Sequence, residues 1–259
     1  MSKLLFLFSY LMPDKISIKV ARFFLALTGI GWGTSVAKSG EKFFLKRLIK
    51  NLDSPIIFDV GANVGDYALS VIKYNSSSKL HLFEPSNSHL KILELKLKSS
   101  NDITINNYGL STKNENLELF KDKEITGLAT VLNRDLKYLD INFSKSEKIK
   151  LMIGDEYITK NRITNIDLLK IDTEGYELNV LKGFKKALSK KLIKNIQFEF
   201  SNASLELKET FRDYYRFLKE FGYNLSVIKP NGHLMVINDY NEIFENYYTT
   251  NFVACYLNE

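Results

Sequence analysis

Two hydrophobic patterns alternate along most of this chain. Short runs rich in β-branched residues predict strands, and stretches whose apolar residues recur every three or four positions predict helices. Strand–helix units that repeat in this way imply an α/β fold with a parallel sheet and right-handed crossovers. We predict strands at 56–60, 80–83, 103–108, 166–171, 193–200, 223–229, 233–237 and 252–257, and helices at 66–74, 86–97, 176–188 and 205–221.

The pattern is interrupted in the segment 114–157, which is more polar than its surroundings. Three short strand-like runs lie there, at 117–120, 130–132 and 148–153. We interpret the segment as an insertion over the edge of the sheet that carries the ligand, and we expect substrate choice to depend on it and on the N-terminal helices. The predicted organisation is an N-terminal helical extension at 1–52 and one large domain at 53–259.

The first 28 residues combine an apolar start with a basic amphipathic helix at 15–27. The apolar positions on one helix face are Ile16, Val20, Phe23 and Leu27, and the basic positions on a neighbouring face are Lys15, Lys19 and Arg22. Residues 1–28 therefore suit peripheral contact with a membrane, or alternatively a cap on the core or a dimer interface. No cleavage site of a secretory leader follows the first apolar run, and another helix is predicted at 41–52.

The segment 56–67 combines a strand, a glycine-bounded turn and a helix start. In an α/β sheet such a turn lies at the carboxyl edge, where free N–H groups and the positive helix end attract a polar ligand. Dinucleotide-binding turns need glycine at the first, third and sixth positions, but counted from Gly61 the third is Asn63 and the sixth is Asp66. Asp59 before the turn suits a cationic group. The pattern therefore favours an adenosyl ligand without phosphates over NAD.

Several blocks of the sequence, in order, resemble the FkbM-type methyltransferases. The blocks are 59–65 (DVGANVG), 83–85 (FEP), 167–177 (DLLKIDTEGYE), 180–183 (VLKG) and 197–199 (QFE). The resemblance runs from about residue 40 to the C-terminus. It implies S-adenosylmethionine as cofactor and the class I methyltransferase fold, which is a Rossmann-like, mostly parallel seven-stranded sheet with helices on both faces. The predicted N-terminal helices lie largely outside it.

The resemblance and the positions at strand ends together assign residues to the cofactor. These residues are Asp59, Gly61, Asn63, Gly65, Glu84, Asn107 and Asp172. Glu84 follows Gly65 by 19 residues (84 − 65), where an acid accepts the hydroxyls of a ribose. Asp59 and Gly61 are expected to meet the amino acid end of S-adenosylmethionine. Asn106 or Asn107 is expected near the adenine.

Three carboxylates are the candidates for catalysis. Asp172 and Glu174 follow one predicted strand and Glu199 lies near the end of the next, so these side chains are expected to converge. Methyl transfer to a hydroxyl requires alignment of the acceptor and removal of its proton, which a carboxylate can accept. In the alternative interpretation, Glu174 and Glu177 cap the following helix. A divalent metal is compatible with carboxylates but is not predicted, and no zinc spacing occurs.

Charge and cysteine content narrow the partners and the compartment. The net charge is +6, but many lysines punctuate the exposed side of one predicted helix and its exit, and no aromatic-interleaved basic groove occurs, so nucleic acid is not predicted. The single cysteine, Cys255, lies in an apolar run and indicates a reducing compartment. We therefore expect a cytoplasmic protein, with the inner face of the membrane as an option through residues 1–28. The oligomeric state is not encoded in any readable pattern.

The favoured function is methylation of a hydroxyl on a sugar, a glycan precursor or a related small molecule. Two alternatives stay open: a nicotinamide-dependent oxidoreductase or epimerase on a similar sheet, and a non-catalytic nucleotide-binding module. The oxidoreductase is disfavoured by Asn63 and Asp66 in the turn. Among the three histidines, His233 after a predicted turn is the one worth testing as a base.

Overall fold

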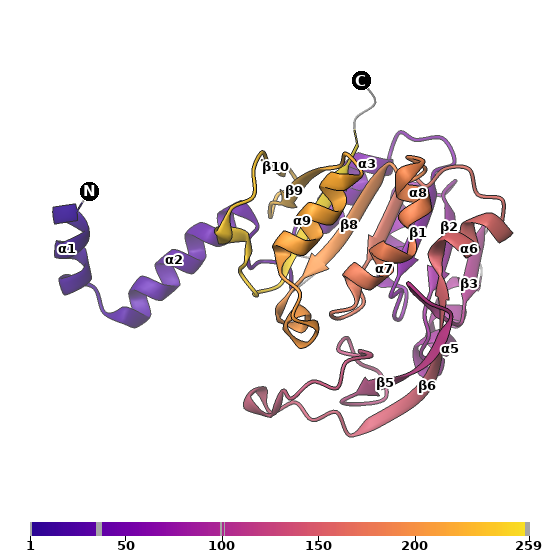
Figure 1. The fold of residues 1–259 in the computed structure, drawn as a ribbon, viewed down its shortest axis with the longest axis horizontal. Coiled ribbons are helices and arrows are strands. Elements are labelled where there is room, and N and C mark those ends of the chain that lie inside the picture. The colour runs from indigo at the N-terminus through magenta and orange to yellow at the C-terminus, as the bar shows by residue number, and fades with distance from the viewer. Residues whose placement is uncertain (1, 35–37, 99, 101, 257–259) are drawn as a thin grey trace.

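The centre of the protein is an eight-stranded, mostly parallel sheet (Figure 1). The computed structural model describes residues 2–34, 38–98, 100 and 102–256. The strands lie in the order β10-β9-β11-β8-β7-β1-β2-β3. Their bounds are β1 Ile56–Val60, β2 Lys79–Phe83, β3 Ile103–Asn106, β7 Leu168–Ile171, β8 Asn195–Phe200, β9 Asn224–Ile228, β10 Leu234–Ile237 and β11 Thr250–Cys255. The predicted Rossmann-like class I fold is confirmed. The sheet has one strand more than the seven that the resemblance implies, because β10, which the hydrophobic pattern predicts at 233–237, pairs with β9.

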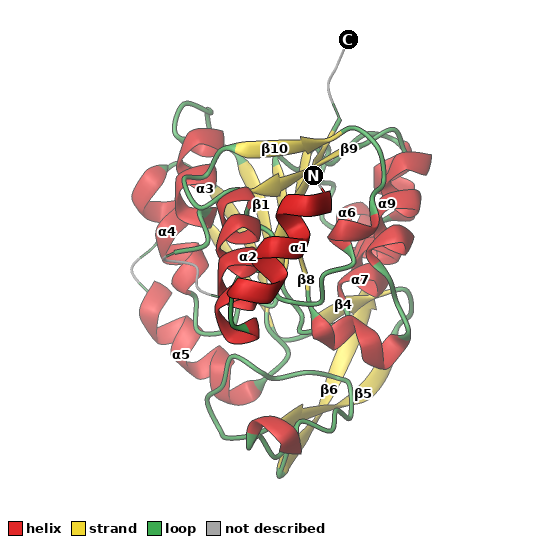
Figure 2. Ribbon diagram, turned by 90° about the vertical axis from the view of Figure 1, so that its left-hand side faces the viewer, coloured by secondary structure: helices red, strands yellow, loops and turns green. Residues whose placement is uncertain are grey.

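Helices cover both faces of the sheet (Figures 1 and 2). Their bounds are α3 Glu41–Ile49, α4 Asp66–Tyr74, α5 Asn87–Leu97, α6 Gly154–Lys160, α7 Glu177–Gly183, α8 Lys185–Ser189 and α9 Phe211–Glu220. Successive side chains of β1 point to opposite faces of the sheet and pack into two separate cores. Ile57 packs with α3, α4 and α5, and Phe58 packs with α7 and α8. Burial on both faces explains why the central strands are apolar without interruption.

Two helices that were predicted as single elements are each divided in the structure, so those predictions are wrong. The helix predicted at 176–188 is split between α7 and α8, because Gly183 ends α7 where its backbone packs against the Ser111 carbonyl group. The helix predicted at 205–221 is a 3₁₀ helix, η2 Asn202–Leu207, followed by α9. Thr210 and Asp213 form a capping box that starts α9, and this local signal was overlooked.

The segment after β3 forms a second, three-stranded sheet below the first in Figure 1. Its strands are β4 Gly109–Ser111, β5 Glu115–Lys121 and β6 Lys145–Ile153, in the order β4-β6-β5. The strand predicted at 103–108 is therefore too long, and the run at 130–132 is no strand, because only Thr130 makes a bridge, to Phe120. Short 3₁₀ helices also occur at η1 Lys137–Leu139 and η3 Glu242–Phe244. The proposed boundaries at 52/53 and at 114 and 157 stay predictions.

The N-terminal helices α1 Ser2–Leu11 and α2 Asp14–Thr28 stand away from the rest of the protein (Figure 1). The helix predicted at 15–27 is confirmed, and the one predicted at 41–52 ends earlier, at Ile49. Among the described residues, no helix is both long enough and apolar enough to cross a bilayer. The strand predicted at 252–257 corresponds to β11, and residue 257 lies outside the described residues.

Candidate active site

The turn after β1 is shaped by close packing against the end of β7. Gly61 has φ +82°, and a Cβ at this position would overlap the Asp172 carbonyl oxygen, so only glycine fits. The backbone N–H groups of Gly61 and Ala62 both donate to the Phe83 carbonyl oxygen, at 3.0 and 3.1 Å. The N–H of Gly65 donates to Ala62. These three amides are therefore already paired inside the protein.

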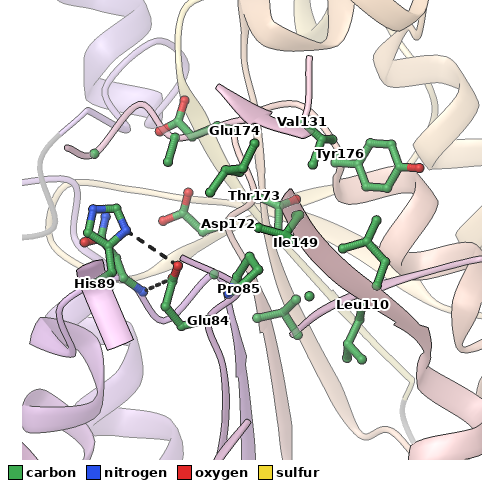
Figure 3. A pocket seen from close by; sticks show the side chains of 18 residues that line it. Glu84, Pro85, His89, Leu110, Val131, Ile149, Asp172, Thr173, Glu174 and Tyr176 are labelled. Atoms are coloured by element: carbon green, nitrogen blue, oxygen red, sulfur yellow. Dashed lines mark hydrogen bonds and ion pairs between the residues drawn. The ribbon is translucent and has the colours of Figure 1, made fainter. Parts of the chain in front are cut away.

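Glu84 is the acid at the end of β2, and it also organises the neighbouring backbone (Figure 3). Its Oε2 accepts from the Asn63 N–H at 2.8 Å and its Oε1 accepts from the Ser86 N–H at 2.9 Å. The Nδ1 atom of His89 lies 3.5 Å from Oε1. Each carboxylate oxygen can accept a second hydrogen bond. Glu84 is thus fixed in place and keeps capacity for two hydroxyl donors.

A cavity of about 190 Å³ opens beside Glu84 (Figure 3). Its far wall is apolar and comes mainly from the second sheet, with Leu110, Leu119, Ile149 and Leu151, and also from Pro85. Gly61, Asn63, Asp172 and Glu174 line its polar side. Sequence reasoning did not find this apolar wall, because the contributing positions lie far apart along the chain. An apolar wall opposite a fixed carboxylate fits a flat base attached to a ribose.

A second cavity of about 360 Å³ shares Gly61, Asn63, Gly127 and Asp172 with the first. Lys170, which was not predicted, lies in its wall: its Nζ is 3.2 Å from Asp59 Oδ1 and 3.2 Å from Asp172 Oδ2. Burial lowers the pKa of Lys170, but the charges of Asp172 and Asp59 together raise it above its ordinary value. Lys170 is therefore a fixed cation at the polar end of the site.

Asp59 lies behind Lys170 and lines neither cavity. It is fully buried, and within the described part of the chain its Oδ2 atom lacks a hydrogen-bond partner. Burial raises the pKa of Asp59, and Lys170 opposes this effect. A buried carboxylate with one free oxygen beside the polar cavity fits a nearby cationic group. Its predicted contact with the amino acid end stays a prediction.

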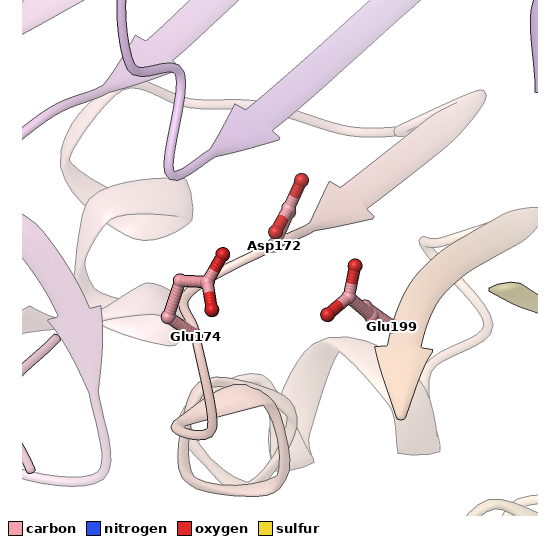
Figure 4. A group of neighbouring side chains, drawn as sticks. All are labelled: Asp172, Glu174 and Glu199. Carbon is pink, nitrogen blue, oxygen red and sulfur yellow. The ribbon is translucent and has the colours of Figure 1, made fainter. Parts of the chain in front are cut away.

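Asp172, Glu174 and Glu199 come together, as predicted from their places at strand ends (Figure 4). One carboxylate oxygen from each lies within 4.8 Å of the others. Burial and the charge of Asp172 raise the pKa of Glu174 to about 8, and the same two causes raise the pKa of Glu199 well above its ordinary value. Glu174 lines the first cavity and Glu199 does not. The cluster can therefore hold and exchange a proton near neutral pH.

Two cations already face this cluster. Lys170 contacts Asp172, and Arg134 Nη1 lies 3.9 Å from Glu174 Oε2. Arg134 is buried, and its Nη2 donates to Asn202 Oδ1 at 3.0 Å. The three carboxylates are ligands that a hard divalent cation accepts, but these side chains already supply positive charge to them. Arg134 was not singled out from the sequence, where no local pattern marks it.

Glu177, the first residue of α7, holds the preceding loop 172–176 in place. Its carboxylate accepts from the N–H and hydroxyl of Thr173, at 2.7 and 3.1 Å, and from the Gly175 N–H at 3.1 Å. These donors belong to the loop before α7 and not to the helix, so the bonds show Glu177 holding this loop and do not support the capping interpretation. Glu174 has φ +54°, and its carbonyl oxygen accepts from the Thr130 hydroxyl at 2.8 Å. The loop therefore presents the Glu174 side chain to the cavity while Glu177 holds the backbone.

The other predicted residues lie outside the walls of the two cavities. Gly65 begins α4 with φ +84° and packs closely against Leu93. Asn107 is exposed and contacts Asn87. His233 is exposed in the turn before β10, three strands from β8. Their functional roles stay predictions.

Three known proteins show what this chain is similar to. The hexuronic acid methyltransferase AglP of Haloferax volcanii is 25% identical over 151 residues, which is 58% of this chain and 58% of that protein. The structure of precorrin-6y C5,15-methyltransferase from Geobacter metallireducens gives a TM-score of 0.45 at 10% identity and covers 83% of this chain and 86% of that one. The Methanococcus jannaschii fibrillarin gives a TM-score of 0.46 at 13% identity, with 87% and 76% covered.

A family comparison covers the largest part of the site. The model of the methyltransferase FkbM domain matches residues 59–225. This range is more than half of the chain and contains the turn after β1, Glu84, Lys170 and the three clustered carboxylates. The chain belongs to the FkbM methyltransferase family.

Proposed function

We propose that this protein transfers a methyl group from S-adenosylmethionine to a hydroxyl group of a saccharide. The observation that carries the proposal is a pair of cavities that share Gly61, Asn63, Gly127 and Asp172. The first has an apolar wall and contains Glu84, and the second contains Lys170. An adenosyl amino acid has matching parts in the same order: a flat base, a ribose with two hydroxyls, and a charged amino acid end.

Each part of the cavity suits one part of that cofactor. The wall formed by Leu119, Ile149 and Leu151 would cover the adenine, and Glu84 would accept the ribose hydroxyls. Lys170 would face the carboxylate of the amino acid end, while Asp172 would face its ammonium group. The sulfonium of the bound cofactor supplies an activated methyl carbon. The residues present therefore fit S-adenosylmethionine.

The paired amides of the turn argue against a dinucleotide. The N–H groups of Gly61, Ala62 and Gly65 bond to backbone carbonyls, and that of Asn63 bonds to Glu84. A pyrophosphate needs free N–H groups at such a turn. The oxidoreductase alternative would therefore have to break hydrogen bonds that stabilise the fold.

Glu174 is the proposed general base. The bound cofactor would supply its methyl group in line to the acceptor oxygen and leave as the thioether, and the Glu174 carboxylate would take the proton of the acceptor hydroxyl. A pKa near 8 makes this carboxylate a better proton acceptor than an ordinary glutamate. Asp172 is held by Lys170 and orients the cofactor, and Glu199 keeps a proton within the cluster.

A groove of about 640 Å³ beyond Asn202 is the proposed binding site for the rest of the acceptor. It is lined by aromatic residues (Trp32, Tyr247 and Tyr248) and by basic residues (Lys19 and Arg22). Asn202 lines this groove and bonds Arg134, which in turn faces Glu174, so the groove lies next to the carboxylates. Aromatic faces and basic side chains suit an acidic saccharide. The likeness to a hexuronic acid methyltransferase supports the same acceptor class.

The test is transfer of a radiolabelled methyl group from S-adenosylmethionine to uronic acid glycosides and to matching neutral hexosides. Label is expected in the acidic acceptors, and Tyr248→Ala should raise the acceptor KM several-fold. Tyr10→Ala, which replaces an exposed tyrosine far from the groove, is the matched control. Binding of S-adenosylhomocysteine without transfer to any hydroxyl acceptor would instead favour the non-catalytic alternative.

A further inference from the structure

The N-terminal arm, residues 2–28, contributes Lys19 and Arg22 to the proposed acceptor groove but otherwise has no part in the proposed function, and most of its described side chains are exposed. Figure 1 shows α1 and α2 outside the layers of the main domain. None of the residues of α2 is buried. The arm joins the domain at its foot, where Leu25 packs on the core and Gly29 fits against the Ile228 carbonyl group. The arm is therefore no cap on the core.

The arm exposes large apolar side chains along its length. Phe6, Phe8, Tyr10, Leu11, Ile16, Ile18, Val20, Phe23, Phe24 and Leu27 are each between 40% and 84% exposed. Single exposed apolar residues are ordinary, but a continuous set of this size marks an interaction surface. The remaining question is what covers it.

The charges of the arm distinguish a second copy of the chain from a lipid bilayer as the partner that covers its apolar side chains. Lys15, Lys19 and Arg22 form a basic stripe beside the apolar face of α2, and Asp14 is the only acidic residue between positions 2 and 28. A symmetric pairing of two copies would bring the same patch onto itself, and this patch offers little negative charge to match its cations. A basic stripe that borders an apolar face is typical of helices that lie in the interface of a bilayer with anionic lipids.

We propose that the arm docks this protein on a bilayer surface that contains anionic lipid. The apolar face of the arm enters the boundary between headgroups and acyl chains, and the basic stripe contacts lipid phosphates. The groove at the foot of the arm shares Lys19, Arg22 and Leu27 with it. Docking therefore brings the entrance of that groove to the level of the headgroups.

The test is co-sedimentation of the full chain with lipid vesicles, which requires no methyl transfer. We expect binding to vesicles of phosphatidylcholine with 30% phosphatidylglycerol, decreasing with added salt, and much weaker binding to pure phosphatidylcholine. Lys15→Gln with Lys19→Gln should weaken partitioning about thirtyfold. Its control is Lys185→Gln with Lys186→Gln, which removes two exposed lysines of α8 and the same net charge.

The apolar contribution is tested by a second pair of variants. Ile16→Asp with Phe24→Asp should abolish sedimentation, whereas Leu95→Asp with Val236→Asp, at exposed apolar positions away from the arm, should leave it unchanged. Retained binding of the arm variant would overturn the proposal, as would wild-type protein that stays in the supernatant. The proposal would also be overturned if the wild-type protein forms a stable dimer without vesicles and Ile16→Asp with Phe24→Asp makes it monomeric. The apolar face would then belong to an interface with a second copy.

Discussion

Replacement of Glu84 by glutamine separates its two roles. The carboxylate accepts from the Asn63 and Ser86 N–H groups at 2.8 and 2.9 Å, and we propose that it also accepts two ribose hydroxyls. Glutamine has nearly the same shape, but its NH₂ group must face one of these buried N–H donors. One donor then loses its partner, which costs about 1–3 kcal/mol of stability.

The effect on the cofactor follows from the lost charge. Hydrogen bonds to a charged acceptor contribute about 1.5–3 kcal/mol and those to a neutral one about 1 kcal/mol. For the ribose hydroxyls together, Glu84→Gln should therefore weaken binding of S-adenosylhomocysteine by about 1–3 kcal/mol, or roughly 5- to 150-fold in Kd.

The assay is calorimetric titration with S-adenosylhomocysteine, combined with urea unfolding of the same samples. Glu94→Gln, on the exposed side of α5, is the matched control and should change neither quantity. If Glu84→Gln lowers the free energy of unfolding but leaves the Kd within twofold of wild type, Glu84 only shapes the turn. The assignment of the ribose site would then be refuted.

Three further predictions concern the base, the turn and the buried cation. The kcat/KM of methyl transfer should rise with pH around pH 8, because Glu174 accepts a proton only when it is ionised. Glu174→Gln should be nearly inactive. A flat wild-type profile from pH 6 to 9 would contradict the role of Glu174 as the base. In urea unfolding, Gly61→Ala should cost about 1–3 kcal/mol or more, because its φ is positive, whereas Gly127→Ala, with open space around it, should cost little; equal losses would refute the packing argument. Lys170→Met should destabilise the fold by about 3–5 kcal/mol at pH 7, because it leaves Asp59 buried and unpaired. The double variant Lys170→Met with Asp59→Leu should recover much of the lost stability. Wild-type stability of Lys170→Met would contradict the importance of this ion pair.

Much of the parallel sheet was predictable from local pattern. The bounds of β1 and α4 match the predictions, because a β-branched run and a periodic helix meet at a glycine turn. The breaks inside the predicted helices at 176–188 and 205–221 were missed, although Gly183 and the Thr210 capping box are readable stop and start signals. The second sheet was predicted only as scattered strands, because its pairing joins residues distant in sequence.

The candidate site was predictable where it depends on the ends of strands. Asp172, Glu174 and Glu199 converge because parallel strands bring their carboxyl ends to one edge. Lys170 and its partner Asp59 are 111 residues apart, so their ion pair follows only from the strand order. A lysine inside the apolar run at 168–171 was nevertheless a signal, since an isolated buried charge requires a partner.

The most direct measurement is calorimetric titration of the wild-type protein with S-adenosylhomocysteine and, separately, with NADH. The turn with paired amides, the fixed Glu84 carboxylate and the apolar wall predict saturable binding of S-adenosylhomocysteine and no heat from NADH. Binding of NADH by a protein that ignores S-adenosylhomocysteine would contradict the account of this site.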